Sequence, residues 1–268
     1  MVEATMERNE IRWKRPKYSF PKRPLLPLAF DLLVGRRRSF AHDSALVMAN
    51  SPYPRRAEGF ERLSNDTSFV LVMNHFNRSG LNTYHAAMAV SAAVAERRPG
   101  RKELSWLLTS EWYGRRIGPI NIPVAVTRWM FARVGLIYDL VVLPRRPELV
   151  MARASSLRRV LSALKGGPVA ITPEAAGSGI LIEPPEGNGL FLATLSRHGY
   201  PLYPLAVFEE GSALVLRVGE PFALRLDHGM TREEADRRAR EESMTAVGRL
   251  LPREYWGVYA AAIERSRA

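Results

Sequence analysis

The feature that most constrains the fold is an apolar run at residues 68–73 (SFVLVM), followed by polar turn residues and then by a periodic apolar stretch. A short apolar run that is rich in β-branched and aromatic side chains is typical of a buried strand. Residues 81–95 have the apolar spacing of a helix. The sequence therefore predicts a strand and a helix joined by a short loop, with Asn74 and His75 where the strand ends.

This position makes His75 a candidate functional residue. In open α/β sheets, ligands bind at the carboxyl ends of the strands. An imidazole titrates near neutral pH, which suits it to accept a proton. A surface histidine or a buried structural histidine would have the same sequence context, so both interpretations stay open here. His85 lies on the predicted helix and is interpreted as structural.

The rest of the chain alternates in the same way, with Gly, Pro and charged turns between apolar segments. Predicted strands cover residues 104–109, 136–143, 168–172, 202–208 and 212–218, and predicted helices cover residues 25–34, 41–49, 124–133, 148–165, 189–198, 231–250 and 255–265. Such alternation indicates a largely parallel central sheet with helices on both faces. The predicted fold class is therefore α/β, with an added helical segment at the N-terminus.

Three regions are predicted along the chain. Residues 1–22 are polar and basic, and we expect them to be flexible. Residues 23–60 form the N-terminal helical segment, in which LLPLAFDLLV precedes three consecutive arginines, at positions 36–38. An apolar helix beside basic residues suits contact with an anionic membrane surface; a helix packed on the domain, with solvated arginines, is the alternative. Residues 61–268 form the α/β domain.

The formal charge of +12 also restricts the partners. A basic protein attracts phospholipid head groups, CoA phosphates and nucleic acid, but no nucleic-acid-binding motif is present, so nucleic acid is not a predicted partner. No stretch is apolar enough to predict a transmembrane helix, and no signal-peptide cleavage site is evident. The chain has no cysteine, which fits a reducing compartment. We expect a cytoplasmic protein at the inner face of the membrane; the sequence does not determine its oligomeric state.

Four sequence blocks, in this order, resemble the motifs of the glycerolipid acyltransferase family, which includes the lysophosphatidate acyltransferases. Asn74-His75 after a strand resembles the start of the family's Asn-His-x4-Asp motif. Residues 140–145 (LVVLPR) resemble a strand that ends near an arginine. Residues 172–178 (TPEAAGS) stand where the family has Phe-Pro-Glu-Gly-Thr-Arg-Ser, and residues 200–205 (YPLYPL) resemble an apolar block with two prolines.

The resemblance implies an acyltransferase of phospholipid biosynthesis that moves a fatty acyl group from acyl-CoA or acyl carrier protein to a hydroxyl of a lysophospholipid or related acceptor. It implies no metal and no organic cofactor. His75 and Glu174 would be the catalytic residues, with His75 as the general base. The residues expected to bind substrate, from their place in or beside these motifs, are Asn74, Arg78, Arg145 and Ser178.

The chain departs from the family pattern in two motifs. Gly80 stands where the family has an aspartate, whose carboxylate orients the imidazole and stabilises its protonated form. Asn82 and Glu174 are candidates to support the imidazole instead. The third block lacks the family's Gly, Thr and Arg, although Gly177, Ser178 and Gly179 can present backbone N–H groups to an anion. A second hypothesis therefore stays open, in which the protein binds lipid or acyl-CoA without turnover.

Overall fold

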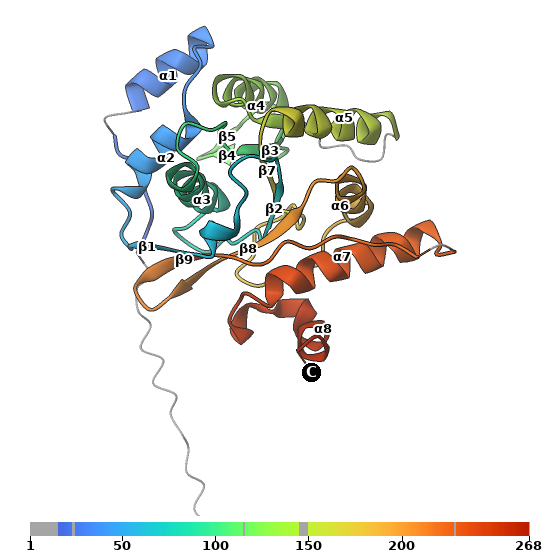
Figure 1. Ribbon diagram of the computed structural model, residues 1–268. Coiled ribbons are helices and arrows are strands. Elements are labelled where there is room, and N and C mark those ends of the chain that lie inside the picture. Colours follow the sequence, from blue (N-terminus) through green and yellow to red (C-terminus); the bar gives the residue numbers. More distant parts are fainter. Residues whose placement is uncertain (1–15, 23–24, 115, 145–149, 228, 268) are drawn as a thin grey trace, which may run out of the picture.

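The computed structural model describes residues 16–22, 25–114, 116–144, 150–227 and 229–267. Within these ranges a seven-stranded sheet has the strand order β1-β9-β8-β2-β7-β3-β6 (Figure 1). Its strands are β1 (Arg55–Glu58), β2 (Val70–Met73), β3 (Ser105–Thr109), β6 (Val141–Leu143), β7 (Val169–Ile171), β8 (Leu202–Glu210) and β9 (Ala213–Val218). The sheet is mostly parallel and has helices on both faces, so the predicted α/β fold class is confirmed.

Strand β2 lies in the middle of the sheet. It pairs in parallel with β7 on one side and with β8 on the other, and β3 and β6 continue the parallel part. Strand β9 returns antiparallel to β8, as the predicted hairpin requires. The carboxyl ends of five strands, β2, β3, β6, β7 and β8, therefore meet at one edge of the sheet, which is the edge where the sequence predicts a ligand.

The alternation of side chains along β2 divides the interior into two cores. Leu71 and Met73 pack with α3 (Thr83–Arg97), which lies against α2 (Phe40–Met48). Val70 and Val72 face the other core. That second core is covered by α5 (Val150–Gly166), α6 (Asn188–Arg197), α7 (Arg232–Gly248) and α8 (Ala260–Arg265). Every residue of β2 is buried, which is why this strand has no polar side chain.

The element boundaries largely follow the sequence, with α1 (Leu25–Val34) as predicted. The predicted strand at 136–143 is wrong in its first half, because α4 (Val124–Tyr138) continues through it and only β6 is extended. Gly135 lets this helix pack closely against the strand that follows, because a Cβ there would lie 2.4 Å from the Val142 side chain. Asp139 then ends α4 in a left-handed conformation, with φ of 54°.

Several short elements were not predicted. The charged edge strand β1 pairs with β9 and brings part of the N-terminal segment into the sheet. A small hairpin joins β4 (Arg116–Ile117) to β5 (Ile120–Asn121) across a Gly-Pro turn. Residues 253–259 form 3₁₀ turns before α8, where a single helix was expected. These elements are too short for apolar periodicity to mark them.

Residues 16–22, predicted as part of the flexible N-terminal region, lie against the domain. Tyr18 is buried, and its backbone N–H donates to the Gly80 carbonyl over 2.7 Å. The Phe20 ring stacks on that of Tyr84, with 5.5 Å between centroids. This segment therefore covers the start of α3. Residues 1–15, the remainder of that predicted region, lie outside the described residues.

The close contact at Gly135 gives a stability prediction. Gly135→Ala should destabilise the fold by about 1–3 kcal/mol, because overpacking against β6 outweighs a helix-propensity gain of about 1 kcal/mol. Gly166→Ala is the matched control, since a Cβ added to this helical glycine would have no atom within 4 Å. Urea unfolding should show a loss for the first variant and no loss for the second. Equal effects would contradict the packing argument.

Candidate functional site

His75 lies where the sequence predicts, just beyond the carboxyl end of β2, and its side chain is half-buried. Glu174 lies beyond the end of the neighbouring strand β7. The register pairs Val72 with Ile171, and His75 and Glu174 each follow three residues after that pair. Parallel pairing therefore carries both residues to the same level of the sheet edge, although they are 99 positions apart.

Glu174 holds the backbone around His75. The His75 N–H donates to one carboxylate oxygen, and the Ile182 N–H donates to the other over 2.9 Å. The carboxylate is almost fully buried, with 3% of the residue exposed. Burial raises the pKa of Glu174 to about 7, although the two backbone donors act in the opposite direction. Glu174 therefore supports the main chain of His75, and the contacts described for its carboxylate are with backbone N–H groups.

The imidazole of His75 is held by a different residue. Its Nδ1 lies 2.8 Å from the hydroxyl oxygen of Thr83, the first residue of α3, and the same hydroxyl lies 3.1 Å from the carbonyl oxygen of Phe76. Burial lowers the pKa of His75 below its ordinary value, which favours the neutral ring. Sequence reasoning did not identify Thr83; the available signal was its position at the start of the helix that faces the strand end.

The other candidate for this contact, Asn82, caps α3 instead. Its side-chain amide donates to the Tyr84 hydroxyl over 2.8 Å, and its backbone N–H donates to the Nδ1 of His85 over 3.1 Å. His85 is 2% exposed and packs against aromatic rings, and its burial lowers its pKa to about 4. The interpretation of His85 as a structural residue agrees with this placement.

Asn74 and Arg78 have partners within the protein. The Asn74 side chain donates to the Val207 carbonyl over 2.9 Å and accepts from the Val207 N–H over 2.8 Å, which continues the pairing of β2 with β8. The Arg78 guanidinium binds both oxygens of Glu209, and it also donates to the carbonyl of Pro16. The role of Asn74 and Arg78 in binding substrate stays a prediction.

The loop after Glu174 packs on the loop that carries His75. The Ser178 N–H donates to the His75 carbonyl over 3.1 Å, and the Ser178 carbonyl accepts from the Asn77 N–H over 2.9 Å. A Cβ on Gly177 would lie 2.6 Å from the Asn77 side chain, so glycine permits this approach. The Ser178 N–H, expected to face an anion, thus serves to join the two loops. Arg145, predicted to bind substrate, lies outside the described residues.

Ala175, the residue after the Pro-Glu turn, has an unusual backbone conformation. Its φ is 56°, in the left-handed region that favours glycine. An alanine in this conformation is strained, so the surrounding loop must hold it in place. Among the described residues, no three His, Asp or Glu side chains gather where they could hold a metal ion.

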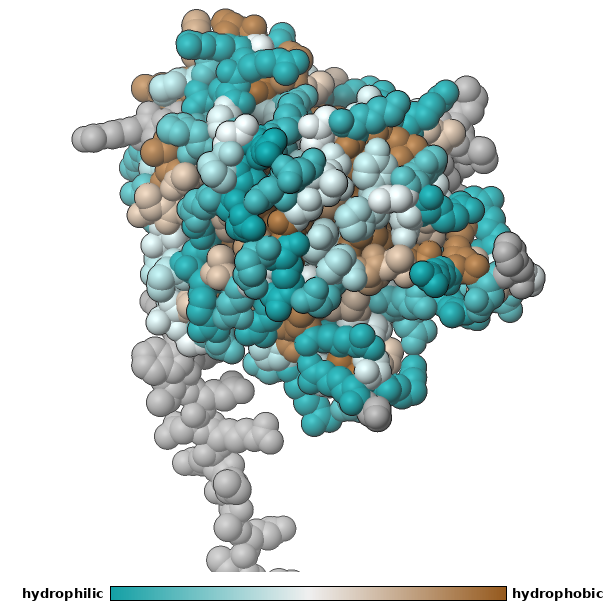
Figure 2. Space-filling view, viewed as in Figure 1, coloured by the Kyte–Doolittle hydropathy of each residue, from teal (hydrophilic) through white to brown (hydrophobic). Residues whose placement is uncertain are grey.

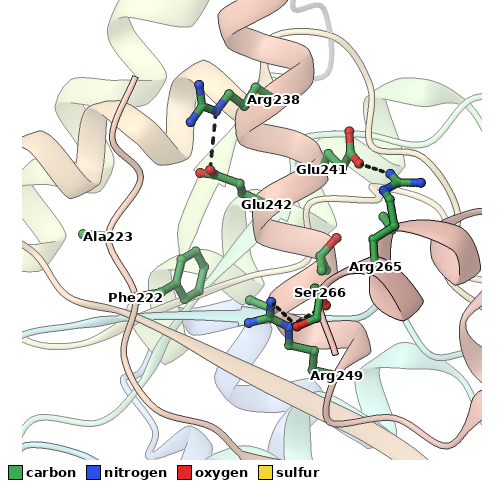
Figure 3. Close-up of a pocket in the computed structure, with 11 residues that line it drawn as sticks. Phe222, Ala223, Arg238, Glu241, Glu242, Arg249, Arg265 and Ser266 are labelled. Carbon is green, nitrogen blue, oxygen red and sulfur yellow. Dashed lines mark hydrogen bonds and ion pairs between the residues drawn. The ribbon is translucent and has the colours of Figure 1, made fainter. Parts of the chain in front are cut away.

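A depression of about 580 Å³ lies elsewhere, between α7, α8 and Phe222. Its charged side chains interact with one another: Arg238 lies 3.5 Å from Glu242, and Arg265 lies 3.2 Å from Glu241 (Figure 3). Its lining contains no residue of the His75 or Glu174 loops. It is therefore separate from the candidate site, and we assign no role to it.

The fold and the site define an α/β protein with a half-buried histidine and a buried carboxylate at the carboxyl edge of its sheet. A similar solved structure is that of the 1-acyl-sn-glycerophosphate acyltransferase PlsC from Thermotoga maritima, which is 15% identical over 91% of this chain and 89% of that chain, with a TM-score of 0.43. No protein-family model and no curated protein matches the chain. The functional assignment below therefore rests on the residues of this chain.

The raised pKa of Glu174 predicts a pH-dependent stability. The folded protein keeps this proton up to about pH 7, whereas the ordinary pKa is 4.5, so ionisation of Glu174 destabilises the fold as pH rises through that window. The full loss in the free energy of unfolding is about 3 kcal/mol. The pKa values of His75 and His85 are lowered, which gives the opposite slope, so the Glu174 contribution must be measured as a difference.

Glu174→Gln stays neutral at every pH and supplies that difference. Relative to wild type, its free energy of unfolding should increase by about 3 kcal/mol between pH 4.5 and pH 8. A constant offset is also expected, because the amide can accept from only one of the two N–H groups. Urea unfolding across this range measures both effects. A difference that does not change with pH would contradict the burial of an ionisable carboxyl at this position.

Proposed function

We propose that this protein is an acyltransferase that moves a fatty acyl group from acyl-CoA or acyl carrier protein to a hydroxyl of a lysophospholipid or related acceptor. The observation that carries the proposal is the position of His75: its half-buried imidazole lies at the carboxyl edge of the sheet, on a backbone held by Glu174. The order of the four motif-like sequence blocks supports the same reaction class.

In this reaction the ring of His75 accepts the proton of the acceptor hydroxyl. The hydroxyl oxygen forms a bond to the thioester carbonyl carbon, and the carbon–sulfur bond breaks. The thiolate that leaves takes the proton from the imidazolium, so the histidine is regenerated and no acyl-enzyme forms. A positioned general base contributes about 10²–10⁴ to such a rate. Glu174 acts by fixing the position of the base.

The alternative is a protein that binds lipid or acyl-CoA without turnover. Two observations favour it: Gly80 provides no carboxylate, and Arg78 is committed to Glu209 rather than to a substrate phosphate. The neutral state of His75 does not separate the two proposals, because a binding protein can keep the same ring. Turnover separates them.

A membrane contact through α1 belongs to the same proposal. This helix exposes most of its apolar side chains, including Leu26, Phe30 and Leu33, and Figure 2 shows brown side chains at the top of the view, over α1. It packs on α4, which exposes Trp129. Among the described residues, no helix is long and apolar enough to span a bilayer.

Charge beside this apolar surface favours an anionic membrane as its partner. Arg36 and Arg37 follow α1 and are exposed. Arg38, the third arginine of the run, is instead bound to Asp31 and Asp43. Two of the three arginines are therefore solvated, which the alternative of a helix packed on the domain also expects. An apolar helix that inserts shallowly while adjacent arginines meet anionic head groups is the arrangement typical of peripheral attachment.

The test of catalysis is acyl transfer by His75→Ala. With acyl-CoA donors and a panel of lysophospholipid acceptors, transfer should fall by about 10²–10⁴. His198→Ala is the matched control, because His198 is exposed at the end of α6 and should leave the rate unchanged. Full activity of His75→Ala would overturn the assignment. Binding of donor without transfer by the wild type would support the non-catalytic alternative.

The test of the membrane contact is sedimentation with vesicles. Phe30→Ser should weaken binding to vesicles that contain phosphatidylglycerol by about tenfold or more, since burying a Phe side chain contributes about 1.5–3 kcal/mol. Val258→Ser is the matched control: Val258 is 66% exposed and Phe30 is 60% exposed, but Val258 lies beside α8. Equal binding by both variants, or equal binding to pure phosphatidylcholine vesicles, would contradict an electrostatically assisted contact through α1.

A further inference from the structure

We propose that Thr83 is the residue that positions the catalytic imidazole, and that its hydroxyl fixes the tautomer in which Nδ1 of His75 carries the hydrogen and Nε2 is free to accept a proton. This inference rests on the proposed function for its catalytic meaning. The tautomer of His75 is inferred from geometry alone. The hydroxyl oxygen of Thr83 lies 2.8 Å from Nδ1 of His75 and 3.1 Å from the carbonyl oxygen of Phe76.

The direction of the two hydrogen bonds follows from what each partner can do. A threonine hydroxyl has one hydrogen to donate and two lone pairs that can accept. The Phe76 carbonyl oxygen can only accept, so the hydroxyl hydrogen goes to it. The Thr83 oxygen then presents a lone pair to Nδ1, and that contact is a hydrogen bond only if Nδ1 carries a hydrogen.

The fold also explains why a residue of α3, and not the residue at position 80, contacts Nδ1 of His75. Gly80 has φ of 84°, which disfavours any side chain. A Cβ at Gly80 would also lie 2.8 Å from the Lys17 side chain and 3.1 Å from the Lys17 Cα. The segment of residues 16–22 thus occupies the space beside Gly80. An aspartate at position 80 is therefore disfavoured by the conformation of the loop and by the chain that covers it.

A neutral hydroxyl and a carboxylate have different effects on the ring. Either can accept from Nδ1 and hold the ring in place, but only a carboxylate adds a charge that favours the imidazolium. With Thr83, the ring keeps its orientation while burial keeps its pKa low. The base is then unprotonated at a lower pH than in a His–carboxylate pair, and it is also a weaker base.

The experiment is ¹⁵N NMR of the imidazole of His75 in the full chain, with assignment from His75→Ala. In wild type at pH 7 we expect protonated Nδ1 and unprotonated Nε2, with the same result for Thr83→Ser. Thr83→Val keeps the shape but removes the hydroxyl, so the tautomer preference should be lost. Thr83→Asp should raise the pKa of His75 by about 1–3 units, because it restores a charge beside Nδ1.

Each outcome decides the inference. A wild-type ring with protonated Nε2 overturns it, and this measurement needs no variant to fold. An unchanged tautomer in Thr83→Val also overturns it; should that variant fail to fold, the tautomers of the wild type and of Thr83→Ser still decide. In acyl transfer, Thr83→Val should lower kcat at least tenfold with little change in KM, and Thr83→Ser should restore it. If the wild type has the expected tautomer but shows no acyl transfer, the proposed function is refuted. The role of Thr83 in fixing the tautomer of His75 then still holds.

Discussion

The site depends on the buried carboxylate of Glu174. Its two oxygens accept from the backbone N–H groups of His75 and Ile182, so it joins the loop after β2 to the far end of the loop after β7. Without an acceptor, these two donors would be left unpaired in a partly buried region, which is unfavourable. Glu174 thus helps to fix the backbone of His75, while Thr83 holds the ring.

Other contacts at the edge extend this arrangement. Asn74 continues the sheet toward β8, Ser178 ties the two loops together, and Arg78 with Glu209 anchors the loop to the end of β8. The sequence predicts that these residues bind substrate, because they are polar and lie beside a strand end, and that role stays a prediction. In the structure they connect β2, β8 and the two loops around His75, whose ring contacts Thr83.

The sequence was sufficient to predict that His75 lies at the carboxyl edge of the sheet, but it was not sufficient to predict the contacts of its ring. Apolar runs locate β2 and β7, but only the structure shows that these two strands pair side by side, which brings His75 and Glu174 together. Thr83 was missed because its role depends on the angle at which α3 leaves the loop. The Arg78–Glu209 pair joins residues 131 positions apart, and charge alone does not distinguish such a partner from a substrate phosphate. The extent of α4 was missed because its last turn is apolar and looks like a strand.

The central claim is that the free nitrogen of His75 is the base in acyl transfer. Carbethoxylation by diethyl pyrocarbonate, mapped by mass spectrometry, tests it most directly, because the reagent attacks the unprotonated imidazole nitrogen. His85 is buried and should resist, whereas His42 and His198 are exposed and serve as internal references. The account predicts that transfer activity falls in parallel with modification of His75, and that donor and acceptor together slow that modification. Transfer that persists after His75 is fully modified would contradict it.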